Sequence, residues 1–145
     1  MTIAELFDKL QTIGNADVRV QNVKTGVLDK LETGDFSYPL VNFNIGEGNN
    51  INIPNSNIQI VMSVFDLLDK DLSDEIDKTS SCFEIGVAIL SQLEYNYKFK
   101  EIEVESIEWE QAVGQTSDFL GGIQFFINLK IFHDFTGCTE FINYE

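Results

Sequence analysis

The sequence predicts a single α+β domain in which two helices pack on a four-stranded sheet, mainly antiparallel or else mixed. Two segments carry apolar residues at helical spacing, and four others alternate apolar and polar residues with the period of a strand. Their order is helix, strand, strand, helix, strand, strand, which is typical of α+β proteins. A chain of 145 residues that is 43% hydrophobic can bury one core, so we expect one domain over residues 1–145.

The first helix is expected close to the N-terminus. Thr2 and Glu5 have the spacing of a capping box, in which each side chain bonds the other residue's backbone N–H. The apolar residues that follow recur at helical spacing: Ile3, Leu6, Phe7, Leu10 and Ile13. Gly14 and Asn15 offer a stop, and a short strand is expected around Val18 to Val23.

Two strands are expected next, because apolar and polar residues alternate in "LVNFNI" and again in "IQIVMSVF". Residues 46–57 between them contain two glycines, five asparagines and a proline, and this segment is long for a tight turn. We expect a projecting hairpin loop there, either a surface loop without a role or a contact to a neighbouring subunit. The candidate contact residues are Asn49, Asn50, Ile51, Asn52 and Ile53.

The acidic segment over residues 66–77 holds five aspartates and one glutamate in twelve residues. Four of its oxygen-bearing side chains have the spacing of an EF-hand calcium loop: Asp69, Asp71, Ser73 and Asp77. However, Asp74 stands where that loop needs glycine, and Ser80 stands where it needs glutamate. We therefore expect a lead-in to a helix, with Asp71 or Ser73 as the cap and carboxylates in the first turn, where they oppose the positive end of the helix dipole.

The central helix is predicted from the spacing of Ile76, Phe83, Val87 and Leu90. Its apolar face is widened by a second set of residues: Cys82, Ile85, Ile89 and Leu93. Polar side chains are confined to about a third of the circumference. Because one sheet cannot cover so wide a face, we expect the N-terminal helix or another subunit to cover its flank.

The third strand is expected to carry a β-bulge near Ser106, because the alternation of apolar and polar residues shifts by one position there. After the shift Ile107 and Trp109 are expected to face the core. Five glutamates are expected on the exposed face of this strand: Glu101, Glu103, Glu105, Glu108 and Glu110. The fourth strand, "IQFFINLKIF", alternates apolar residues again, and its second face carries Phe126 and Phe132.

Composition argues against several functions. With 24 acidic and 9 basic residues the net charge is −15, the wrong sign for a protein that grips nucleic-acid phosphates. The single histidine, His133, has no nucleophile signature around it, and Cys82 and Cys138 lack metal-site spacing. We expect no enzyme activity, cofactor or metal. The start "MTIAELFDKL" has no features of a signal peptide, so we expect synthesis in the cytoplasm and no membrane partner.

The chain resembles small virion proteins of tailed bacteriophages, of the tail-completion or tail-terminator group. The resemblance spans nearly the whole chain. It rests on the N-terminal helix, the strand segment "YPLVNFNI", the link "VFDLLDKDLSDEIDKTSSC" and the closing phenylalanine-rich strand. The group's diffuse acidic signature is matched by Val64, Asp66, Leu67, Asp71, Ser73 and Glu75. The sequence departs from the pattern at Asp74, where asparagine is expected, and in its asparagine-rich 46–57 segment.

The resemblance implies a structural protein that forms a ring, commonly sixfold, at the end of a tail tube or in the neck between head and tail. Its partners would be other copies of itself, other tail or neck proteins, and passing DNA without specific binding. The glutamates could then face the lumen and repel that DNA, or lie outside and only aid solubility. The alternatives are an acidic decoy that imitates DNA and a protein–protein adaptor.

Overall fold

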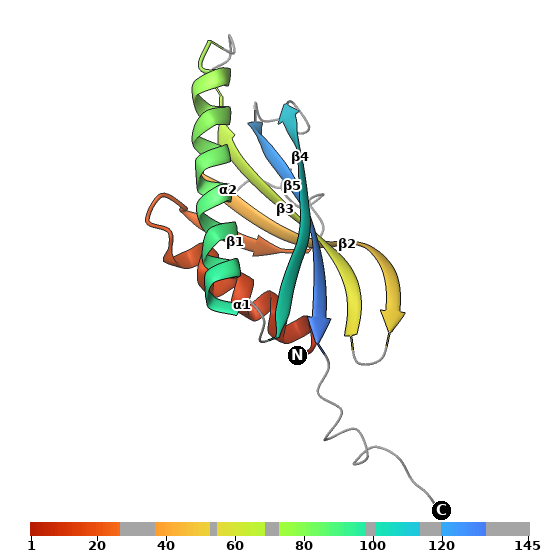
Figure 1. Ribbon diagram of the computed structural model, residues 1–145. Coiled ribbons are helices and arrows are strands. Elements are labelled where there is room, and N and C mark those ends of the chain that lie inside the picture. Colours follow the sequence, from red (N-terminus) through yellow and green to blue (C-terminus); the bar gives the residue numbers. More distant parts are fainter. Residues whose placement is uncertain (27–36, 53–54, 69–72, 98–100, 114–119, 133–145) are drawn as a thin grey trace, which may run out of the picture.

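The computed structural model describes residues 1–26, 37–52, 55–68, 73–97, 101–113 and 120–132 (Figure 1). They form two helices and one five-stranded sheet, so the α+β expectation is confirmed, with one strand more than predicted. The elements are α1 (Ile3–Ala16), β1 (Asn22–Thr25), β2 (Leu40–Asn52), β3 (Asn55–Leu67), α2 (Glu75–Tyr97), β4 (Ile102–Val113) and β5 (Leu120–Phe132). The strand order is β1-β2-β3-β5-β4; only β1 and β2 are parallel, so the sheet is mixed.

Helix α1 begins with the predicted capping box. Thr2 Oγ1 accepts a hydrogen bond from the Glu5 backbone N–H, and Glu5 Oε2 accepts one from the Thr2 N–H, both at 3.1 Å. The helix does not stop at Gly14 but continues to Ala16. Gly14 is buried against β1, where an added Cβ would lie 3.2 Å from Val23 Cγ2. Because Gly14 has no side chain, the helix and the strand can lie close together at this position.

Strand β1 lies later than predicted, at Asn22–Thr25. The chain first makes a turn in which the Val20 N–H bonds the Asp17 carbonyl, while Val18 is exposed. Strand β1 then pairs in parallel with the first four residues of β2, Leu40–Phe43. A four-residue parallel strand carries little alternation, which is why its position could not be predicted closely.

The prediction of a long loop over residues 46–57 is wrong. Strand β2 continues to Asn52 and β3 begins at Asn55, with Asn52 opposite Asn55, so the hairpin extends through this segment. The pairing register shifts between Ile45 and Gly48 and again between Gly48 and Ile51. Such irregularities add residues to one strand and interrupt its alternation, so the segment looked like a loop in the sequence.

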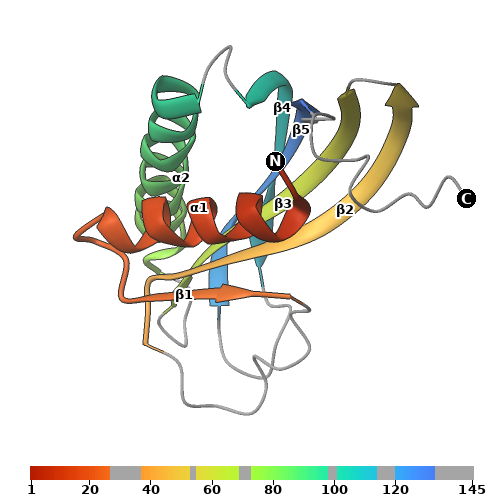
Figure 2. The ribbon, with the colours of Figure 1, turned by 90° about the horizontal axis from the view of Figure 1, so that it is seen from below.

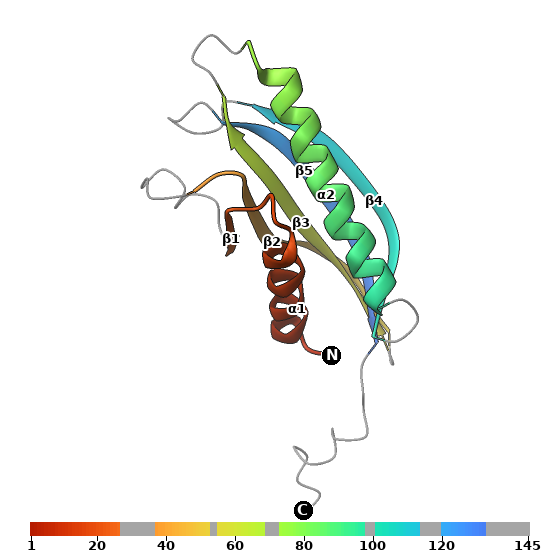
Figure 3. The ribbon, with the colours of Figure 1, turned by 90° about the vertical axis from the view of Figure 1, so that its left-hand side faces the viewer.

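Both helices lie on the same face of the sheet, as Figure 3 shows. Helix α2 packs on β3, β5 and β4, and α1 lies beside it against β1 and β2 (Figure 2). Helix α1 contributes Leu6, Leu10 and Ile13 to the core. Helix α2 contributes Cys82, Ile85, Ile89, Leu90 and Leu93. The main core is thus a single layer between the helices and the sheet.

The start of α2 differs in detail from the prediction. The helix begins at Glu75, and the Asp74 carbonyl accepts the first helical hydrogen bond, from the Lys78 N–H at 2.9 Å. Asp74 therefore holds the capping position in place of Ser73, and Asp71, the other predicted cap, lies outside the described residues. Glu75 and Asp77 occupy the first turn as expected. There the helix dipole favours carboxylates.

Strand β4 has the predicted bulge, since its pairing with β5 shifts between Val104 and Ser106. The shift keeps Ile102 and Val104 on the helix side before the bulge and places Ile107 and Trp109 on that side after it. Strand β4 is the last strand in the sheet order. Its position at the edge decides how well these side chains are covered.

Gly86 provides a test of the helix–sheet packing. An added Cβ at this position would collide with the ring of Phe125, which is buried on β5. Alanine is a better helix former than glycine by about 1 kcal/mol, but overpacking a core costs about 1–3 kcal/mol. We therefore expect Gly86→Ala to lower the free energy of unfolding, measured in urea.

The matched control is Ser81→Ala, on the exposed side of the same helix, which should change stability by no more than about 0.5 kcal/mol. Adding Phe125→Leu to Gly86→Ala should lessen the cost of the alanine, because the two positions are in contact. A Gly86→Ala protein as stable as the original would contradict this account of the packing.

Candidate association surface

Five apolar side chains remain exposed between α2 and β4, and we call them the apolar strip. Their exposed fractions are 76% for Ile76, 36% for Phe83, 42% for Val87, 41% for Ile107 and 57% for Trp109. Ile107 and Trp109 were expected to face the core, whereas the three residues of α2 belong to the wide apolar face whose flank was expected to need a further cover. Helix α2 instead turns its other set, Cys82, Ile85, Ile89 and Leu93, to the sheet. The expectation that one sheet cannot cover this helix is confirmed, and α1 does not cover the strip.

Aromatic contacts hold the centre of the apolar strip in place. The Phe83 ring lies edge-on to Trp109, with centroids 5.3 Å apart and planes at 64°. On its other side Phe83 stacks on the buried Phe125, at 5.8 Å and 29°. Such pairs contribute about 0.5–1.5 kcal/mol beyond the area they bury. The exposed rings are therefore anchored to the core through Phe125.

Two shallow hollows flank the Phe83–Trp109 pair. One, of about 220 Å3, lies toward the end of α2 and is lined by Phe83, Val87, Leu90, Ser91, Glu94, Val104, Ile107, Trp109 and Phe125. The other, of about 350 Å3, lies toward the start of α2 and is lined by Ile76, Thr79, Ser80, Phe83, Trp109, Gln111 and Ile123. In a packed protein interface, side chains of the partner fill hollows of this kind and surround the aromatic rings between them.

Polar groups close the strip at the start of α2. The Gln111 side-chain amide of β4 donates to Glu75 Oε1 at 2.9 Å and to Thr79 Oγ1 at 3.5 Å. These bonds tie the edge strand to the first turns of the helix. The strip is therefore a surface with fixed geometry, formed jointly by two elements.

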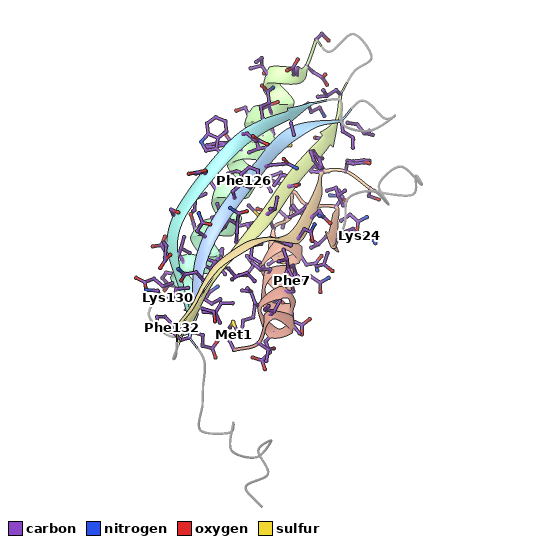
Figure 4. All side chains as sticks on the ribbon, turned by 90° about the vertical axis from the view of Figure 1, so that its right-hand side faces the viewer. Met1, Phe7, Lys24, Phe126, Lys130 and Phe132 are labelled. Atoms are coloured by element: carbon purple, nitrogen blue, oxygen red, sulfur yellow. The ribbon has the colours of Figure 1, made fainter. Side chains whose placement is uncertain are left out.

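Four of the five predicted glutamates lie on the opposite, open face of the sheet. Figure 4 looks onto this face, where Lys130 and Phe126 are labelled. Lys130 of β5 pairs with two of them, at 3.4 Å from Glu105 Oε1 and 4.0 Å from Glu103 Oε2. Glu108 and Glu110 are exposed and stand opposite Phe126 and Gln124 in the register. Lys130 therefore offsets part of the repulsion between Glu103 and Glu105, although such half-exposed ion pairs contribute little stability.

Glu101 does not belong to this group. It lies just before β4 begins, and its carboxylate is 3.8 Å from Lys9 Nζ of α1. Because α1 lies on the helix side of the sheet, this pair lies apart from the other glutamates. The acidic face of β4 therefore consists of Glu103, Glu105, Glu108 and Glu110.

The rest of the open face mixes hydrogen-bonded polar groups with half-buried apolar side chains, among them the predicted Phe126 and Phe132 of β5. Gln124 Nε2 donates to the buried Ser63 Oγ at 3.4 Å, and Asn128 Nδ2 donates to Ser106 Oγ at 2.9 Å. At one end Phe65 reaches across Gly122, which has no side chain, to form a small apolar cluster with Ala112 and Leu40. The strip and this face therefore differ sharply in character.

The other predicted candidates are placed as follows. Asn49, Asn50, Ile51 and Asn52 lie on β2 near the end of the hairpin, and Ile53 is outside the described residues. Asp66 pairs with Lys78 Nζ at 3.4 Å. The described part of the acidic segment, like the rest of the described chain, contains no cluster of three potential metal ligands. His133 and Cys138 also lie outside the described residues.

Two further features of the helix side were not anticipated. A hollow of about 370 Å3 separates α1 from α2 and is lined by Thr12, Ile13, Ala16, Asp17, Ala88, Ile89, Gln92 and Asn96. Burial raises the pKa of the Cys82 thiol to about 12, with the nearby Asp66 carboxylate adding to the effect. A thiol with this pKa stays protonated and is a poor nucleophile at neutral pH.

No family model matches the chain, and no curated protein matches it in sequence. Among the described residues, neither helix has the length and apolar character needed to span a membrane.

Proposed function

We propose that this protein is a structural component of a tailed-phage virion, which forms a ring as a tail-completion, tail-terminator or neck protein at the head–tail junction. The observation that carries the proposal is the apolar strip, five contiguous exposed side chains with anchored aromatic rings at their centre. A patch of this kind on a folded domain marks a protein–protein contact. The sequence resemblance supplies the phage context.

The aromatic composition of the strip supports a stable contact. Interface energy is concentrated in a few aromatic or arginine side chains near the centre of the contact, surrounded by residues that exclude water. Trp109 and Phe83 have this arrangement, because Ile76, Val87 and Ile107 lie around them. A repeated contact between copies of one chain closes into a ring when its rotation permits.

The acidic face suits the DNA passage that this role requires. Glu103, Glu105, Glu108 and Glu110 add negative charge to one face of a chain whose net charge is −15. Turned toward the lumen, such a face repels phosphates and keeps a duplex from adhering. An acidic decoy also requires exposed carboxylates, but it has no need for the apolar strip.

The role of the apolar strip in self-association can be tested with the double variant Val87→Gln and Trp109→Gln. Both positions are partly exposed, and glutamine adds no charge. We expect the original protein to form a multimer, and the variant to dissociate at concentrations where the original stays assembled. Loss of a central aromatic residue costs about 2 kcal/mol per contact, or roughly a thirtyfold weaker association. Light scattering after size-exclusion chromatography measures the mass.

The matched control is Val18→Gln, at an apolar residue that is 91% exposed on the turn after α1. It should leave both the mass and the free energy of unfolding unchanged. A monomeric original protein at high concentration, or a double variant that assembles normally, would count against the proposal.

The lumen-facing role of the acidic face is tested by replacing Glu103, Glu105, Glu108 and Glu110 with lysine. Among virions that still assemble, we expect impaired packaging or ejection of DNA, because the reversed charge attracts phosphates. The same positions changed to glutamine remove the repulsion without adding attraction and should give a smaller defect. Full infectivity of an assembled lysine variant would place the glutamates outside the lumen.

A further inference from the structure

The sheet has two stretches of strand edge without a partner among the described residues. Strand β4 lies at one end of the strand order. At the other end β1 pairs with Leu40–Phe43 of β2, so the rest of that strand, Asn44–Asn52, has a partner only on its β3 side. A bare edge is a template for pairing with another chain, and proteins usually protect it.

The edge of β4 is regular over most of its length. From Ser106 to Val113 its pairing with β5 proceeds without a shift, so the outward N–H and C=O groups keep the regular alternation of an antiparallel edge. The bulge between Val104 and Ser106 confines the irregular part to one end. A strand from another chain could therefore pair with eight residues of β4 without meeting a bulge.

The two sides of this edge differ chemically. Ile107 and Trp109 point to the helix side and belong to the apolar strip. Glu108 and Glu110 point to the open face, opposite Phe126 and Gln124. A strand that fits beside β4 must offer apolar side chains on one side and tolerate carboxylates on the other.

The free part of β2 offers this combination. Ile45 lies opposite Ile60 on the helix side and is 49% exposed, although Val41 and Phe43 on the same side are buried. Asn44 lies on the open-face side, and its amide group carries N–H donors that a carboxylate accepts. Residues 44–52 contain four asparagines, Asn44 among them, and one charged residue, Glu47, so little negative charge opposes the glutamates of β4.

We propose that the free edge of β2 in one copy of this protein pairs with the edge of β4 in the next copy, head to tail. The alternative of two β4 edges pairing with each other would bring glutamates of one copy against glutamates of the other, which is unfavourable. With the helices of both copies on one side of the joined sheet, the two edges run antiparallel, because β2 and β4 have opposite directions. Asn44–Asn52 then align with Ser106–Val113, since β1 already covers Leu40–Phe43. This register brings Ile45 near Gln111 and Trp109, so the contact also covers part of the apolar strip. Because each copy uses two different edges, the contact repeats from copy to copy.

This inference rests on the proposed self-association and specifies its geometry. Site-directed cross-linking tests it with two single-cysteine variants, Asn44→Cys and Glu108→Cys, each in a Cys138→Ser background. Cys82 is fully buried and does not compete for the reagent. Asn44 and Glu108 are then about four residues apart along the paired edges, or roughly 13 Å. A bismaleimide with a spacer of that length is added to each variant alone and to an equimolar mixture, and Val18→Cys replaces each partner in turn as the control for random encounters.

We expect cross-linked dimers in the Asn44→Cys and Glu108→Cys mixture and none from either variant alone or from mixtures with Val18→Cys. A protein carrying both cysteines should give a ladder of multimers. Cross-linking of Glu108→Cys with itself would show β4 paired with β4 and would overturn the inference. A multimer by mass without the mixed cross-link would overturn it while leaving self-association intact, whereas a monomer by mass would remove both.

Discussion

The packing of α2 on β5 is the constraint on which the other surfaces depend. Phe125 fills the space that Gly86 leaves open on the helix and is stacked by Phe83. This contact sets the rotation of α2 about its axis, so Ile85 and Ile89 turn to the sheet while Ile76 and Val87 turn away. The apolar strip is therefore a consequence of core packing, and its rings are held in place from beneath.

The edge position of β4 converts this packing into a surface for association. A further strand beside β4 would cover Trp109 and Ile107, but β4 ends the sheet among the described strands, so both remain accessible. On the other face the same strand carries glutamates, two of them paired with Lys130. One strand thus offers an apolar side suited to cohesion between copies and an acidic side suited to repelling phosphates.

Local signals in the sequence predicted much of this fold. The capping box at Thr2, the alternation in β3 and β5 and the bulge before Ser106 each depend on neighbouring residues, and each was confirmed. The rotation of α2 could not be predicted, because apolar residues occupy most of its circumference and only Phe125, distant in sequence, selects among them. The hairpin over 46–57 was missed because its register shifts interrupt alternation. The sequence indicated the apolar strip only as a helix face wider than one sheet can cover.

Hydrogen–deuterium exchange at two protein concentrations, above and below the assembly threshold, can show whether copies of the protein pair through their strand edges. Backbone amides paired across a new strand contact exchange more slowly. The account predicts that assembly slows exchange in β4 from Ser106 to Val113 and in β2 from Asn44 to Asn52, with little change in β3. A protein that assembles without added protection in either edge would contradict it.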